Sequence, residues 1–222
     1  QKPLKQIDAI HIFFGSWCGD SKKEVPRFLK IMDALKFDNI QLIGLDHTFQ
    51  NYKQSPFGEE VGLGIHRVPT FIFYSDSTEV GRIVEEPVTN LEEDIYQLLT
   101  TDEYRPSYDI VHDVQNILAE KGADYLLYHV DSIAQELSAK AETVSALSTY
   151  ALVLLTSFEI KASEAVYILN TKLFSEEYYP YYGLGRIYQR IGNERLATLA
   201  YTEGLLKTPE NDRLKEQLAR LD

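Results

Sequence analysis

The stretch that decides the fold is FFGSWCGDSKKEVPRF, residues 13–28, in which an apolar run ends at a glycine and a helical pattern begins. It contains the single cysteine of the chain, Cys18. Upstream, residues 7–14 (IDAIHIFF) are β-branched and aromatic, which is typical of a buried strand. Downstream, apolar residues recur at spacings of three and four over residues 21–35, which predicts an amphipathic helix. The sequence therefore predicts a strand, a short loop that carries a thiol, and a helix.

The next seventy residues continue this alternation. Residues 39–46 (NIQLIGLD) predict a second strand, and a strand–helix–strand unit of this kind forms a parallel pair. After a polar, glycine-rich stretch, expected to be a loop with one helical turn near Glu59, two short apolar runs with a turn between them predict a hairpin, and a closing helix follows. We expect an α/β domain.

The rest of the chain has no strand pattern. The apolar pattern is interrupted between residues 100 and 106, where Asp102, Glu103 and Pro106 occur. We therefore expect two domains, an α/β domain over residues 1–103 and an all-α domain over residues 104–222. The helices are predicted near residues 107–120, 123–140, 143–157, 160–174, 178–191, 194–207 and 210–221.

The last helices follow a 34-residue period. With Tyr178 as position 1, aromatic, leucine, small and proline residues occupy positions 4, 7, 8, 11, 20, 24 and 32, namely Tyr181, Leu184, Gly185, Tyr188, Ala197, Tyr201 and Pro209. This pattern resembles the tetratricopeptide repeat, and departs from it at position 27, where Gly204 replaces the usual alanine. A degenerate copy precedes it in register. The resemblance implies stacked antiparallel helix pairs, with the final helix as a solvating cap.

Three features of the first hundred residues carry a second resemblance. They are the run Trp17-Cys18-Gly19-Asp20-Ser21, the proline eight residues after the cysteine, and the segment Val68-Pro69-Thr70 before the hairpin. Together they resemble the thioredoxin superfamily over residues 7–100. The resemblance implies a thioredoxin-like α/β domain with helices on both faces of a mixed four-stranded sheet, whose strands lie in the order 40–46, 8–14, 70–75 and 79–85. The resemblance implies that Cys18 is the exposed attacking thiol and Trp17 a wall beside it. It also implies a cis Val68–Pro69 bond, with the Val68 backbone presented to an extended substrate peptide.

The chain differs from that family at the two positions that a dithiol cycle requires. Ser21 stands at the position of the resolving cysteine, and Ile12 at the position of a buried acid. The strand and helix usual at the family's N-terminus are also missing, unless they lie upstream of Gln1. A lone thiol cannot close an intrachain disulfide or complete a dithiol cycle by itself, so a mixed disulfide at Cys18 must be resolved by another thiol. We expect Ser21 to donate a hydrogen bond to the thiolate.

The surroundings of the thiol favour and oppose its ionisation. The N-terminus of a helix stabilises a thiolate, whereas the nearby Asp20 carboxylate opposes it. Arg67 precedes Pro69, and we expect it to favour the thiolate or contact substrate, with a plain surface role as the alternative. Residues 18–21 are also similar to the Cys-Gly-Phe-Ser of monothiol glutaredoxins, which hold iron–sulfur clusters with glutathione, but the preceding Trp17 and the helix proline Pro26 argue against that interpretation.

Composition excludes other classes. The chain has 22 Lys and Arg against 34 Asp and Glu, a net charge of −12, and no basic cluster, which argues against a nucleic-acid partner. Its longest apolar run, residues 150–155, is far below the ~20 residues of a membrane span. His11 and His47 have no second ligand nearby in sequence. We expect no metal and no bound cofactor.

The sequence thus favours a monothiol thiol–disulfide oxidoreductase or isomerase that acts on protein disulfides through Cys18. We expect the helical domain to recruit protein or peptide clients, and a small thiol or partner oxidoreductase to complete the reaction. The alternative is a redox-inactive adaptor or chaperone. Because the chain begins at Gln1 rather than Met, we expect a bacterial protein exported to an oxidising compartment after removal of a signal, with a cytoplasmic location as the alternative.

Overall fold

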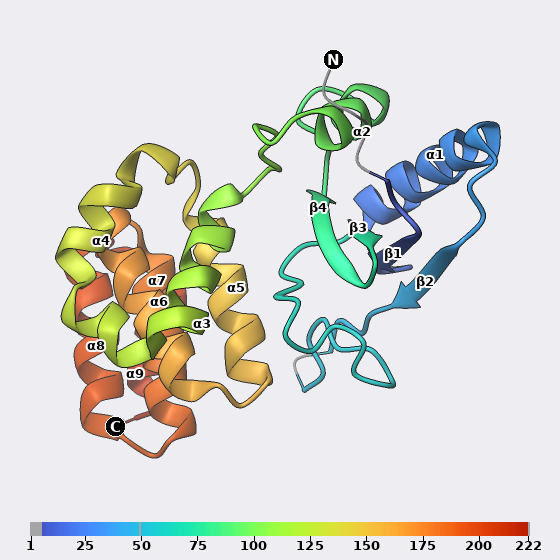
Figure 1. The fold of residues 1–222 in the computed structure, drawn as a ribbon. Helices are drawn as coiled ribbons and strands as arrows, with labels where there is room; N and C mark the ends of the chain where they lie inside the picture. Colours follow the sequence, from blue (N-terminus) through green and yellow to red (C-terminus); the bar gives the residue numbers. More distant parts are fainter. Residues whose placement is uncertain (1–5, 49, 222) are drawn as a thin grey trace. The chain divides into compact units, whose positions relative to one another are not determined.

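The chain divides into two compact units, one ending at Asp109 and the other beginning at Ile110. This division is seen in a computed structural model, shown in Figure 1, which describes residues 6–48 and 50–221.

The first unit contains a four-stranded mixed sheet, as predicted. Its strands lie in the order β2-β1-β3-β4, with β1 parallel to β2 and antiparallel to β3, and β3 antiparallel to β4. The strands are β1 (Ala9–Phe14), β2 (Ile40–Gly44), β3 (Thr70–Ser75) and β4 (Thr78–Val84), and the helices are α1 (Gly19–Leu35) and α2 (Leu91–Thr100).

The pairing of β1 with β3 brings two distant loops to the same end of the sheet. Phe13, near the end of β1, lies opposite Thr70, at the start of β3. Because these strands are antiparallel, the loop that leaves β1 and the segment that enters β3 lie at one edge. The thiol loop and the Val68–Pro69 segment are therefore neighbours in space.

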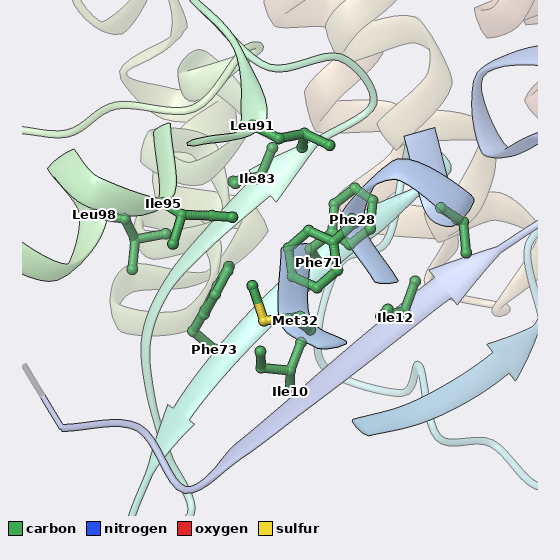
Figure 2. Close-up of a cluster of buried hydrophobic side chains, with 11 residues drawn as sticks. Ile10, Ile12, Phe28, Met32, Phe71, Phe73, Ile83, Leu91, Ile95 and Leu98 are labelled. Atoms are coloured by element: carbon green, nitrogen blue, oxygen red, sulfur yellow. The ribbon is translucent and has the colours of Figure 1, made fainter. Parts of the chain in front are cut away.

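The expectation of helices on both faces of the sheet is wrong. Side chains of α1 and α2 pack in one cluster, on the face formed by Ile10, Ile12, Phe71 and Phe73. Figure 2 shows this cluster, in which the rings of Phe28 and Phe71 stack with centroids 4.3 Å apart. Within the described part of this unit, the residues packed on the opposite face come from strands and from segments that are not helical, namely Phe13, Cys18, Ile43, Leu45, Leu63, Ile65, Val68, Ile72 and Tyr74.

The glycine-rich segment after β2 explains this arrangement. It forms turns around Glu59 in place of the expected helical turn. Gly58 and Gly62 both have positive φ, 77° and 78°, a conformation that ends a right-handed helix. The segment covers the second face as a loop, and buries Leu63 and Ile65 against it.

The second unit is built of helices that follow one another in Figure 1 from green α3 to red α9. They are α3 (Asp109–Tyr128), α4 (Val130–Leu137), a short 3₁₀ turn (Ser138–Lys140), α5 (Val144–Thr156), α6 (Ile160–Leu173), α7 (Tyr178–Arg190), α8 (Glu194–Lys207) and α9 (Asp212–Ala219). None of the helices within the described ranges is long and apolar enough to cross a membrane.

One helix prediction in this unit needs correction. Residues 123–140 do not form a single helix, because α3 ends at Tyr128 and α4 begins at Val130. His129, between them, has φ −106° and ψ 17°, which is not helical. The expected break at Gly122 is present as a non-helical residue with φ 82° inside α3.

Glycines allow neighbouring helices of this unit to pack closely. A Cβ added at Gly185 of α7 would lie 2.1 Å from Cε1 of Tyr201 of α8, and a Cβ at Gly183 would lie 2.2 Å from Cε1 of Tyr167 of α6. Tyr201 is fully buried, and its hydroxyl donates to Oε1 of Gln189 at 2.7 Å. The ring of each tyrosine thus occupies the volume that any larger residue at the glycine would need.

We expect Gly185→Ala to lower the free energy of unfolding of the helical unit by about 1–3 kcal/mol, because the added methyl overlaps a buried ring that cannot move freely. Chemical denaturation followed by circular dichroism measures this. Leu199→Ala, at an exposed position of α8, is the control and should change stability by no more than about 0.5 kcal/mol. Equal effects of the two substitutions would contradict the packing described.

Candidate functional site

Cys18 is the N-cap residue of α1, with extended backbone angles of φ −87° and ψ 133°. Its carbonyl accepts from Lys22 N at 3.2 Å, which starts the helical hydrogen bonding. Its side chain is half-buried and packs against the second apolar cluster of the unit, beside Val68. Its side chain makes no capping hydrogen bond, but the N-terminal end of a helix favours negative charge in its neighbourhood.

The thiol has two acceptors. Sγ of Cys18 lies 3.2 Å from the carbonyl oxygen of Val68 and 3.6 Å from Oδ2 of Asp20. The Val68–Pro69 peptide bond is cis. A carbonyl oxygen can only accept, so in this contact the sulfur is the donor. That carbonyl, which we expected to be presented to a substrate peptide, is occupied by the thiol.

Trp17 is held beside the thiol loop. Its indole Nε1 donates to the carbonyl of Leu45 at 2.9 Å, and its ring lies 5.4 Å from the ring of His47. A Cβ at Gly15 would fall 2.5 Å from the indole, so glycine is required for the loop to fold back under the ring. With 36% of its surface exposed, Trp17 is an anchored but accessible aromatic wall.

Ser21 has a different partner from the one expected. Its side chain is almost fully buried, and its Oγ accepts from the backbone N–H of Gly15 at 3.1 Å. No hydrogen bond joins Ser21 to Cys18 among the described residues. In this state Ser21 closes the loop around the thiol, because it ties the end of β1 to the first turn of α1.

Arg67 points into an ion pair. Its Nη1 lies 3.3 Å from Oε1 of Glu85, and its guanidinium lies 4.6 Å from the centre of the Tyr108 ring. Tyr108 in turn donates to the second oxygen of Glu85, and burial together with that carboxylate raises the pKa of Tyr108 to about 12. The structure therefore shows Arg67 engaged with Glu85 and Tyr108.

His66, next to Arg67, is buried with 4% of its surface exposed. Its Nδ1 lies 3.2 Å from the carbonyl of Gly64, and its ring meets the Tyr108 ring edge-on at 6.0 Å. Burial lowers the pKa of His66 to about 3. The imidazole is thus neutral near pH 7 and adds no charge to the site.

Lys53 is a residue of this region that no sequence motif singles out; it lies in the loop after β2 and has only 4% of its surface exposed. Its Nζ donates to the carbonyl of His66 at 2.5 Å and lies 5.3 Å from the centre of the Tyr52 ring. Burial, and then the Arg67 charge, lower the pKa of Lys53 to about 8, while Glu85 and Cys18 act in the opposite direction. Nothing in the sequence distinguished this lysine from others in polar loops.

The structure thus gathers Cys18, Ser21, Trp17 and the Val68–Pro69 segment at one end of the sheet, and Lys53 binds the carbonyl of His66, two residues before Val68. Within residues 6–48 and 50–221, no group of three or more His, Cys, Asp or Glu side chains is placed to hold a metal ion. What remains is a lone thiol at a helix N-terminus. Its chemistry is that of a nucleophile or of a hydrogen-bond donor.

Comparison with known proteins finds a relative of part of the chain. Over 85 residues the chain is 31% identical to a protein named thioredoxin from Malassezia sympodialis, an alignment that covers 38% of this chain and 75% of that protein. No family model matches the chain.

The buried Lys53 predicts a pH dependence of stability. The unfolded chain titrates this lysine near pH 10.5 and the folded chain near 8, so folding releases a proton between these values and stability rises with pH there. Below about pH 8 the lysine is protonated in both the folded and the unfolded chain, and the buried ammonium lowers the free energy of unfolding by its full amount. We expect Lys53→Met to abolish a stability gain of about 2 kcal/mol between pH 7 and 9.5.

Urea unfolding of both proteins at each pH measures this. Tyrosine ionisation affects the wild type and the variant alike, so the difference between them isolates the lysine. If the free energy of unfolding changes with pH in the same way in the wild type and in Lys53→Met, the Lys53 ammonium is solvated and its pKa is not lowered by folding.

Proposed function

The chain belongs to the thioredoxin family, and from that membership we propose that it performs thiol–disulfide exchange on protein clients through Cys18, without a resolving cysteine of its own. The observation that carries the proposal is the position of Cys18 at the N-terminus of α1, with its sulfur 3.2 Å from the Val68 carbonyl beside the cis bond to Pro69. The proposal places this activity in an oxidising compartment, where client disulfides persist.

The proposed reaction begins with release of the Cys18 proton to solvent, which also frees the Val68 carbonyl. The thiolate attacks one sulfur of a client disulfide, a new Sγ–S bond forms, the client S–S bond breaks, and its electron pair leaves on the second client sulfur, which takes up a proton. The freed Val68 carbonyl can then accept a backbone N–H of the extended client segment beside Pro69. There is no net redox change in this exchange.

The adduct requires a thiol from outside the chain. Ser21 occupies the position from which a second cysteine would attack, and a hydroxyl cannot displace a thiol to form a disulfide. Ile12, where a proton-carrying acid would lie, is fully buried in the cluster shared with α1. A client thiol or a small thiol therefore attacks the mixed disulfide, and this suits isomerisation or prolonged capture of a client.

Mixed-disulfide trapping tests the proposal. After incubation with a disulfide-containing unfolded protein and acid quenching, the wild type should show an adduct by mass spectrometry that is absent in Cys18→Ser. Ser21→Cys should shorten the lifetime of the adduct at least tenfold, because it restores an intramolecular attacker, and should yield a disulfide between Cys18 and the introduced thiol. No adduct in the wild type would reject the exchange reaction.

A redox-inactive adaptor is the second candidate, and specific contacts favour it. The thiol donates to Val68, Asp20 lies 3.6 Å from the sulfur, and Ser21 is bound to Gly15. All three are compatible with a site that only holds its loop in place. Under this alternative, Cys18→Ser binds clients as tightly as the wild type and no adduct forms.

The helical unit is proposed to recruit the clients as a tetratricopeptide-like domain. The close approach at Gly185 supports this, because the sequence pattern calls for a small residue there and an aromatic one at Tyr201. A pocket of about 530 Å³ lies between α7 and α9. The residues that line it are spaced three and four apart along each helix, so each helix contributes one face. These residues are Tyr182, Arg186, Gln189, Arg213, Glu216, Gln217 and Arg220.

This pocket has three arginines and one glutamate in a chain whose net charge is −12. Arg220 is paired with Glu216 at 2.5 Å, and Arg186 donates to the hydroxyl of Tyr182 at 3.1 Å. Arg213 makes no hydrogen bond or ion pair with any described residue. Guanidinium groups bind carboxylates in a bidentate manner, so the pocket favours acidic segments of clients.

Charge reversal tests this preference. We expect Arg213→Glu to weaken binding of an acidic peptide at least fivefold, measured by fluorescence anisotropy at low salt, and to leave binding of a neutral peptide unchanged. Arg195→Glu, an exposed arginine of α8 outside the pocket, is the matched control. If both variants lose the same affinity, net charge rather than the pocket recruits the peptide.

A further inference from the structure

The feature that the proposed reaction leaves unexplained is the buried ammonium of Lys53. A lysine at 4% exposure is costly to bury unless it is fully paired. Its Nζ is bound to the backbone carbonyl of His66 and lies near the ring of Tyr52. A methionine at this position would fill a similar volume without a charge to bury.

The position of the ammonium relates it to the thiol. Lys53 binds the carbonyl of His66, and Cys18 binds the carbonyl of Val68, two residues further along the same segment. Charge and sulfur thus contact one short stretch of backbone at the entrance to β3. Their interaction favours the ammonium form of Lys53 when Cys18 is ionised, and by reciprocity the ammonium favours the thiolate.

The other charged groups around Lys53 do not replace it in this role. Glu85 accepts from both Arg67 and Tyr108, and its carboxylate offsets the Arg67 charge at 3.3 Å. His66 is neutral. Arg82, which also acts on His66, is bound to Glu79 at 2.6 Å. Asp20, on α1, opposes the thiolate at 3.6 Å from the sulfur.

We propose that Lys53 is the positioning residue of the exchange reaction, whose buried ammonium stabilises the Cys18 thiolate while it attacks a client disulfide. This rests on the function proposed above. The lysine forms no covalent bond and keeps its proton throughout, and the proton of Cys18 leaves to solvent. The Lys53 ammonium, which binds the His66 carbonyl, thereby acts in a site where Ile12 replaces the buried acid of the dithiol members of the family.

Alkylation kinetics test the role of Lys53 independently of any disulfide. The rate of Cys18 modification by iodoacetamide is measured from pH 5 to 10 in the wild type, in Lys53→Met and in Lys22→Met, which removes an exposed lysine four residues from the thiol. We expect Lys53→Met to react about tenfold more slowly at pH 7 and to approach the wild-type rate above pH 9. Lys22→Met should change the rate less than twofold, because solvent and salt screen its charge.

A reciprocal measurement keeps the proposal testable if Lys53→Met does not fold. NMR titration of the Lys53 side chain in Cys18→Ser should give a lower pKa than in the wild type, because the thiolate that favours the ammonium is gone. A Lys53→Met rate within twofold of wild type at pH 7, or an unchanged Lys53 titration in Cys18→Ser, would overturn the proposal. Failure of the exchange reaction itself would appear differently, as an absence of mixed disulfides in a wild type whose alkylation still depends on Lys53.

Discussion

The antiparallel register between β1 and β3 is the constraint on which the site depends. With Phe13 opposite Thr70, the loop after β1 and the segment before β3 must end at the same edge, although 50 residues separate Cys18 from Val68. The contact between the thiol and the Val68 carbonyl follows from that register. A slip by one residue would turn Ile12 and Phe13 to the opposite faces of the sheet and separate the two loops. Burial of these side chains in the two apolar clusters therefore fixes the register that forms the site.

Groups around the Cys18 thiol have opposite effects on its ionisation. The N-terminus of α1 and the ammonium of Lys53 favour the thiolate, whereas Asp20 and the hydrogen bond to Val68 favour the thiol. Burial of Lys53 raises the cost of folding below about pH 8. A costly buried charge on the same short segment that a half-buried thiol contacts is more typical of a functional site than of a scaffold.

Local pattern predicted most of the fold. The strands, α1 and the break at Gly122 follow from periodicity and from glycine, which act over a few residues, whereas the expected sheet order came from the resemblance to the thioredoxin superfamily. The loop that covers the second face of the sheet could not be predicted in this way. Gly58 and Gly62 adopt positive φ there, and this backbone conformation forms turns where a helical turn was expected. Tertiary contacts decide the rest of the site: Ser21 binds Gly15 rather than the thiol, and Lys53 is buried because the His66 carbonyl accepts its hydrogen bond. Neither partner is visible in sequence.

The central claim is that the fold activates Cys18 as a nucleophile toward disulfides. The most direct test is the second-order rate of its reaction with a small model disulfide at pH 7, measured for the folded protein and for the same chain unfolded in urea. The helix N-terminus and the buried ammonium of Lys53 exist only in the folded state, so activation predicts that the folded protein reacts at least tenfold faster. A folded protein that reacts no faster than the unfolded chain would contradict the claim and leave the thiol a structural residue of a binding protein.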